Sequence, residues 1–201
     1  MKVQSLITLF VGAGISLTSS SAFAHPGVPH SEGLLSGFAH PFTGIDHLLT
    51  MLAVGLLASR INPLALNAPR SWRLPASFML SMAIGCMLPL AGHSLHLHLP
   101  LNVEPLVLAS MIIMGVLVAN PLRLPATLLA SLVGFFGFCH GLAHGLEQPT
   151  GANGGLFLMG ALLATGLLHS SGLFVASWVR QALVRAAGAA IAAAGLLLAS
   201  V

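Results

Sequence analysis

The sequence predicts an all-α, polytopic membrane protein with six transmembrane helices after a cleaved signal peptide. Of its 201 residues, 56% are apolar and only 5% are charged, and the mean hydropathy is +0.96. An average soluble domain has roughly a quarter of its residues charged. The apolar residues also gather in stretches long enough to cross a hydrocarbon core of about 30 Å. Together these observations exclude a soluble fold.

Residues 1–24 have the three parts of a secretory signal peptide. Lys2 precedes an apolar stretch from Leu6 to Leu17, and a small-residue segment then ends in Ala22-Phe23-Ala24. The alternative is an uncleaved anchor helix, but the apolar stretch is short for a membrane span, which needs about 20 residues. We therefore expect cleavage after Ala24, which leaves residues 25–201 as one transmembrane transport domain.

The six predicted spans are separated by segments with helix-breaking residues or arginines. In chain order the spans lie at about 34–58, 75–92, 104–119, 125–146, 155–178 and 183–201. The first four connections contain Asn62-Pro63, Leu99-Pro100, Asn120-Pro121 and Gln148-Pro149. Such Pro-containing dipeptides mark turns and loops. The fifth connection is short and carries Arg180.

The arginines orient the spans. Every arginine falls in the first, third or fifth connection or at its edge: Arg60, Arg70, Arg73, Arg123, Arg180 and Arg185. By the positive-inside rule these connections are cytoplasmic. The opposite side then holds the mature N-terminus and three of the four acids, Glu32, Glu104 and Glu147. An acidic outer side and a basic inner side suit a cation collected from outside.

Asp46 is the acid predicted inside a span, in the segment His40-Pro-Phe-Thr-Gly-Ile-Asp-His47. An ionisable residue there costs about 2.5 to 3.5 kcal/mol on insertion scales, so it indicates a functional site. Four residues would share one face of a continuous helix: His40, Gly44, His47 and Met51. Pro41 is expected to kink or start this helix. The alternative is that Asp46 and one histidine only hydrogen-bond between helices.

A second candidate cluster ends the fourth span. His140, His144 and Glu147 are spaced i, i+4 and i+7, which places two imidazoles and a carboxylate on one helical face, as chelation of a metal ion requires. Beside them lies a ridge of small residues, Gly137, Gly141 and Gly145. Such a ridge lets another helix approach closely. The alternative is a histidine pair merely solvated at the membrane surface.

Depth in the membrane connects the two clusters. At 1.5 Å per residue, His40 and His140 each lie about 10 Å below the outer ends of their spans. We expect these two histidines at one level and His47 deeper. Spans one and four would then form a ladder of ligands that leads inward.

Several residues are weaker candidates. His25 would be the mature N-terminus, where an amine and an imidazole can together bind a divalent metal, or it is simply solvated. His169, in the fifth span, either completes a metal pathway or bonds between helices. An outer connection carries three more histidines, for metal collection or solvation: His93, His96 and His98. Cys86 and Cys139 are expected to be buried as small hydrophobic residues, and the methionines to pack.

The residue types narrow the ligand. Imidazole and carboxylate groups without a cysteine cluster suit Ni, Co, Zn or Cu(II) better than Cu(I), Mg or Ca. The formal charge of +3 does not indicate a nucleic-acid partner, because the basic residues are few and scattered. Lys2 is the sole lysine, so the chain has no Walker A motif for ATP. Transport would be passive, ion-coupled or driven by a partner.

Two segments carry a family resemblance. His40 to His47 with Met51 and Gly55, and Phe138 to Gly145, resemble the HupE/UreJ family of bacterial nickel permeases, which are linked to hydrogenase and urease maturation. The signal peptide ending just before a histidine fits as well, and the resemblance covers nearly the whole chain.

The resemblance implies uptake of Ni²⁺, with Co²⁺ as the other candidate, through the bacterial inner membrane, with the mature N-terminus in the periplasm. It implies no enzymatic activity, no prosthetic group, and hydrogenase or urease maturation proteins as partners. Five residues receive roles: His40, Asp46, His47, His140 and His144.

These residues lead to one hypothesis and two alternatives. In the hypothesis, the ion is captured by His25, His140, His144 and Glu147, passed to His40, Asp46 and His47, and released inward. An intramembrane hydrolase would use the same residues to hold zinc and activate water, although the sequence has no HExxH or GxSxG motif. The other alternative is a membrane metal sensor or maturation factor that transports nothing.

Overall fold

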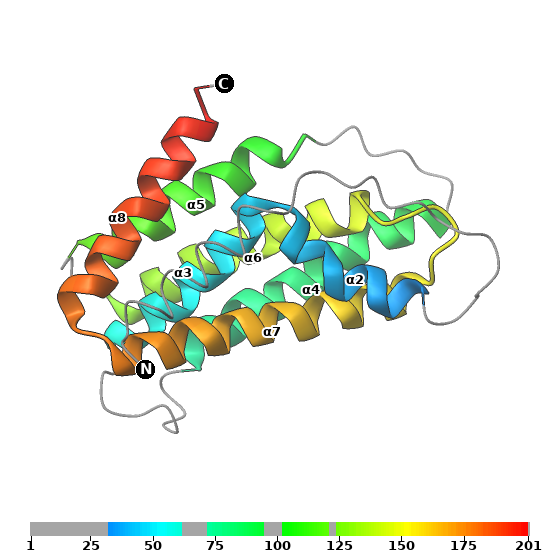
Figure 1. Ribbon diagram of the computed structural model, residues 1–201. Coiled ribbons are helices and arrows are strands. Elements are labelled where there is room, and N and C mark those ends of the chain that lie inside the picture. Colours follow the sequence, from blue (N-terminus) through cyan, green and yellow to red (C-terminus); the bar gives the residue numbers. More distant parts are fainter. Residues whose placement is uncertain (1–31, 62–71, 95–101, 121–123, 201) are drawn as a thin grey trace.

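The computed structural model describes residues 32–61, 72–94, 102–120 and 124–200. Within these ranges the chain is helical and has no strand, which confirms the all-α prediction there (Figure 1). The helices are α2 (Glu32–Thr43), α3 (Ile45–Ile61), α4 (Arg73–Ser94), α5 (Glu104–Ala119), α6 (Ala126–Leu146), α7 (Gly154–Trp178) and α8 (Gln181–Leu198). The expected signal peptide, His25, His96 and His98 lie outside the described residues.

The helices fit a multi-pass membrane protein. Among the described residues, α4, α6, α7 and α8 are long and apolar enough to cross a membrane. Helices α2 and α3 pass the same test together as one bent pair. Helix α5 is apolar but has only 16 residues. The structure thus supports four or five spans by length and composition, and the count of six stays a prediction.

The first expected span is two helices, and the break does not fall at Pro41, where a kink or a helix start was expected. The break falls at Gly44, with a bend of 84° between the two parts, whereas Pro41 lies inside α2. Pro41 has no N–H to donate to the preceding turn, and the Thr43 hydroxyl donates to the His40 carbonyl at 2.7 Å. The Gly44 carbonyl then accepts from the Leu48 N–H at 3.0 Å, as the new helix begins. The four-residue face predicted on one helix is therefore wrong.

Helices α4 and α6 pack along the predicted glycine ridge. A Cβ on Gly137, Gly141 or Gly145 would overlap the backbone of α4. The prediction that this ridge admits a second helix is confirmed. Between lipid-embedded helices, close backbone approach replaces the hydrophobic driving force that water would supply. The ridge therefore fixes α6, and with it His140 and His144, against α4.

Helix α7 packs against both halves of the broken pair (Figure 1). Gly37 on α2 and Gly160 on α7 permit close contact in the first half. Gly55 on α3 and Gly172 on α7 do the same in the second. Helix α3 also packs against α5, which in turn pairs with α8. Contacts on several sides hold α3 in the interior, in a direction that the break at Gly44 allows.

One end of the helix bundle gathers arginines. The Arg60 guanidinium donates to the carbonyls of Leu117, Val118 and Asn120 at the end of α5, at 3.0, 2.6 and 2.6 Å. Arg185 donates from Nε to the Ala119 carbonyl at 2.9 Å. Cations are favourable at a helix C-terminus, where carbonyls lack partners. Helices α3 and α5 thus end where α8 begins, as the alternating topology predicts.

Candidate metal site

An open pocket of about 820 Å³ lies at the end of the bundle opposite the arginines. Its walls come from the α2–α3 break, the start of α5, the end of α8 and the residue after α6. Five of its lining residues are acids or histidines: His40, Asp46, His47, Glu104 and Glu147. A pocket with three acids attracts cations.

Three histidines converge beside this pocket. His40, His47 and His144 each offer a ring nitrogen, and these three atoms lie within 4.8 Å of one another. The ring centroids of His40 and His144 are 4.8 Å apart, and those of His47 and His144 are 4.9 Å apart. We call this group the three-histidine cluster. Its members come from α2, α3 and α6, so the cluster exists only when the helices are packed.

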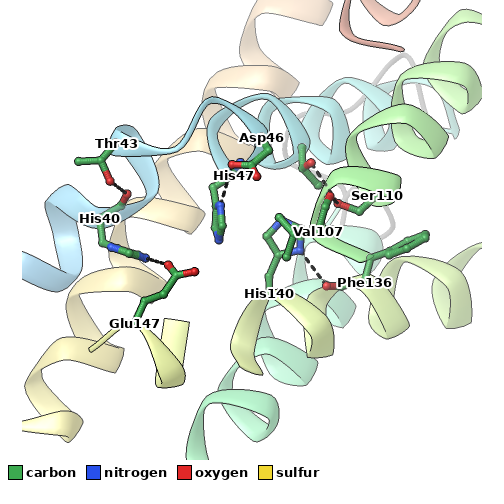
Figure 2. Close-up of polar contacts among 10 residues, drawn as sticks. His40, Thr43, Asp46, His47, Val107, Ser110, Phe136, His140 and Glu147 are labelled. Atoms are coloured by element: carbon green, nitrogen blue, oxygen red, sulfur yellow. Dashed lines mark hydrogen bonds and ion pairs between the residues drawn. The ribbon is translucent and has the colours of Figure 1, made fainter. Parts of the chain in front are cut away.

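Asp46 fixes the orientation of His47. The Asp46 carboxylate accepts from the His47 backbone N–H at 2.7 Å and from His47 Nδ1 at 2.9 Å (Figure 2). Because the carboxylate accepts a hydrogen bond from Nδ1, the ring proton is on Nδ1, and Nε2 of the neutral ring keeps a lone pair. That Nε2 atom is buried and has no hydrogen-bond partner. A carboxylate that holds the other ring nitrogen in this way is typical of metal-binding histidines.

Gly44 makes room for the Asp46–His47 pair. A Cβ at this position would lie 2.8 Å from Asp46 Oδ1 and 3.1 Å from His47 Nδ1. Any larger residue would therefore push against the hydrogen bond that orients His47. The glycine serves both the helix break and the site.

His144 is fully buried and makes no hydrogen bond. Its side chain has 0% exposure, and neither Nδ1 nor Nε2 has a partner. A buried polar group without a partner costs roughly 1 to 3 kcal/mol. The cost is explained if His144 is kept for a ligand that binds between the three rings.

His140 lies one turn before His144 and faces His47. Its ring centroid is 4.9 Å from that of His47. Nδ1 donates to the Phe136 carbonyl at 2.9 Å (Figure 2), since a carbonyl can only accept. Nε2 is left buried with a lone pair and no partner. His140 thus presents the same kind of ligand atom as His47.

Glu147 meets α2, at the rim of the pocket. Its Oε2 atom lies 2.8 Å from His40 Nε2, and the two side chains point toward each other in Figure 2. The Glu147 side chain is 39% exposed and the His40 side chain 21%. Both side chains are thus partly exposed at the rim, whereas His140 and His144 are fully buried.

The histidines of the two clusters pair differently from the prediction. We predicted that His40 and His140 lie at one level, but His40 packs against His144, and His140 packs against His47. The bend at Gly44 turns α3 relative to α2, so depths counted along a straight helix do not apply. The three residues expected to chelate a metal on one face of α6 are likewise not the closest group of ligands. Glu147 caps the end of α6 and pairs with His40 instead.

Other sequence-predicted residues lie elsewhere. His169 is buried deeper in the bundle, and His93 lies in the last turn of α4. Cys86 and Cys139 are buried and unpaired, as expected. Glu104, which the sequence marked only as an outer acid, lines the pocket with Asp46 and Glu147. The signal in the sequence that could have marked Glu104 was its position at the start of an apolar helix.

The comparisons with known proteins agree with the motifs. A family model described as "HupE / UreJ protein" matches residues 13–198. Protein HupE of Rhizobium leguminosarum bv. viciae is 38% identical to this chain in an alignment of 202 positions, which covers 98% of this chain and 98% of that protein. No solved structure gives a significant match. The matches extend over both histidine segments and nearly the whole sequence, and the chain therefore belongs to the HupE/UreJ family.

Proposed function

We propose that this protein is a secondary permease that takes up Ni²⁺, with Co²⁺ as a second cargo, across the bacterial inner membrane. The observation that carries the proposal is the three-histidine cluster: three ring nitrogens within 4.8 Å, beside an acid-lined pocket. Imidazole with nearby carboxylate suits borderline divalent metals. Family membership supports the same assignment.

In the proposed orientation, the pocket faces the periplasm and the arginine end faces the cytoplasm. The broken pair α2–α3 and the short helix α5 complete six crossing segments with the four long helices. The mature N-terminus is periplasmic after signal cleavage. This arrangement follows the positive-inside rule, since Arg60 and Arg185 then lie at the inner surface.

The proposed route begins at the accessible carboxylates. Glu147 and Glu104 concentrate the cation in the pocket, with His25 as a further capture ligand. The ion then binds between His40, His47 and His144, and His140 accepts it on the inner side of His47. The ion can leave because no point on the route holds it with the charged, closed four-ligand shell of a structural zinc site, which would retain it.

The membrane potential is a sufficient driving force. Each charge gains about 2.3 kcal/mol per 100 mV. A divalent cation moving inward therefore gains about 4.6 kcal/mol, which supports roughly three decades of accumulation. The accumulated metal would supply nickel enzymes such as hydrogenase or urease through their maturation proteins.

Accumulation of radioactive nickel in cells tests the proposal. We expect wild-type cells to accumulate the metal, and cells with Asp46→Asn or His47→Ala to stay at the level of cells without the protein. Ser171→Ala is the matched control, because this exposed hydroxyl donates its hydrogen bond to the Leu167 carbonyl of its own helix. A zinc hydrolase or a metal sensor would give no accumulation even in the wild type, which would overturn the proposal.

A further inference from the structure

A second polar group lies inside the bundle, outside the pocket and the three-histidine cluster. His169 and Thr165 lie one turn apart on α7, Met51 on α3 and Met82 on α4. All four side chains have 0% exposure. Apolar side chains would suffice for packing in an interior next to lipid. The contacts of this imidazole and this hydroxyl therefore indicate their role.

The contacts bring three potential ligand atoms together and hold His169 one turn away along α7. Thr165 Oγ1 lies 3.3 Å from the Met51 sulfur and 3.5 Å from the Met82 sulfur. His169 Nδ1 lies 2.7 Å from the Met51 carbonyl oxygen. Since this oxygen can only accept, the proton is on Nδ1, and Nε2 has the lone pair. Nε2 is buried without a hydrogen-bond partner.

Phe78 separates this group from the outer histidines. Its ring centroid is 5.1 Å from that of His140 and 5.2 Å from that of His169. Along α3, Met51 follows His47 by one helical turn toward the arginine end. The second group therefore lies inward of His47 and His140, with the ring of Phe78 between His140 and His169.

We propose that His169, Met51, Met82 and Thr165 form an inner metal site, which receives the ion after it passes Phe78. This inference rests on the proposed transport function. All four ligand groups are neutral. The carboxylates of Asp46 and Glu147 instead pair with the three-histidine cluster, and we call this cluster and its carboxylates the outer site. A divalent cation at the inner site has no compensating charge, so it binds more weakly there and can be released.

The ligand types also give this site a role in selectivity. Thioether sulfur and imidazole nitrogen bind borderline and soft metals, whereas Mg²⁺ and Ca²⁺ require oxygen ligands. A hard cation that the outer carboxylates attract would find only one oxygen ligand side chain among these four. The inner site therefore passes nickel and cobalt and rejects magnesium and calcium.

The competing explanation is that His169 only ties α7 to α3 through the Met51 carbonyl. His169→Asn separates the two roles, because an asparagine amide N–H replaces Nδ1–H and no atom replaces Nε2. Ser170→Ala is the matched control on the same helix, since this hydroxyl bonds only the Gly166 carbonyl. We expect His169→Asn to lower nickel uptake about tenfold or more, with thermal stability and nickel affinity of the outer site unchanged. Uptake within twofold of wild type would overturn the inner site.

X-ray absorption on nickel-loaded protein tests the site without transport. The His47→Ala/His144→Ala double variant lacks two outer ligands, so its remaining bound nickel should show sulfur in the first coordination shell. Adding His169→Asn or Met51→Leu should remove that signal. A nickel shell without sulfur in the double variant would overturn the inner site. If the wild type binds nickel with sulfur but does not transport it, the proposed function fails and the inner site stands.

Discussion

At the residue scale, the positions of histidine protons decide what this protein can bind. Three histidines direct Nδ1 at an oxygen acceptor and keep a buried Nε2 lone pair: His47, His140 and His169. The acceptors are the Asp46 carboxylate and the carbonyls of Phe136 and Met51. Fixed tautomers spare the ion the cost of reorienting its ligands, since the rings are already in place.

Asp46→Asn tests this control of the tautomer. An asparagine amide can donate to His47 Nδ1, which moves the ring proton to Nε2 and removes the lone pair. We expect nickel affinity to fall about 10- to 100-fold, as for other residues that orient metal ligands. Equilibrium dialysis of the purified protein measures the affinity, with Asp46→Glu as the control that keeps the charge. Equal affinities in wild type and Asp46→Asn would contradict the role of Asp46.

The identity of the site residues could be predicted from the sequence better than the contacts between them. An acid between histidines in an apolar stretch marks Asp46, His40 and His47 without a structure. The contact between His40 and His144 could not be predicted, because it depends on how far α3 turns at Gly44. Glu104 was missed as a pocket residue for a related reason: only the packing of α5 on α3 brings it near Asp46.

At the element scale, the break between α2 and α3 is the decisive feature. It directs His40 toward Glu147 and His144, and turns α3 so that His47 meets His140. Pro41 was the expected breaker, but an interior proline can be tolerated when its neighbours keep the helix. Gly44, with no Cβ, permits the turn and leaves space for the Asp46–His47 pair.

Gly44→Ala should disable the site and leave the fold intact. The added methyl group meets Asp46 Oδ1 at 2.8 Å and His47 Nδ1 at 3.1 Å, and alanine favours a continuous helix by about 1 kcal/mol over glycine. We expect nickel uptake to drop about tenfold or more, with little change in melting temperature. Gly155→Ala is the control, because its Cβ meets only Asn153 Oδ1 at 3.4 Å. Full uptake in Gly44→Ala would show that the break tolerates a side chain.

Helix packing was the most predictable part of the fold. The spacing of Gly137, Gly141 and Gly145 indicates a close neighbour, and α4 occupies that place. Small residues at every fourth position leave few other arrangements in lipid. The identity of the neighbour could not be predicted, since a ridge specifies the distance of approach but not the helix that approaches.

At the scale of the whole molecule, charge divides the bundle into two ends. Arg60 and Arg185 bond the carbonyl end of α5, whereas Glu104 and Glu147 line the pocket at the other end. His140, His144 and His169 are buried in the bundle. In the proposed transport, a cation moves from attraction at the acidic end to repulsion at the basic end, so its release would depend on the membrane potential and on weak inner binding.

Nickel uptake should decline in acid. A protonated imidazole has no lone pair and carries a positive charge, so protons compete with the metal at each histidine. We therefore expect the rate of nickel uptake to decrease as the pH falls from 7.5 to 5. The initial rate at pH 5, 6 and 7.5, at a fixed membrane potential, measures this dependence. Undiminished uptake at pH 5 would argue against histidine ligands.

Nickel entry into liposomes that contain only the purified protein tests the central claim most directly. The variant to compare is His144→Phe, which keeps a ring, removes both nitrogens and breaks no hydrogen bond, because His144 makes none. With an inside-negative potential of about 100 mV, we expect wild-type vesicles to accumulate nickel and His144→Phe vesicles to match protein-free ones. Equal accumulation by the two proteins, or none by the wild type, would contradict the account.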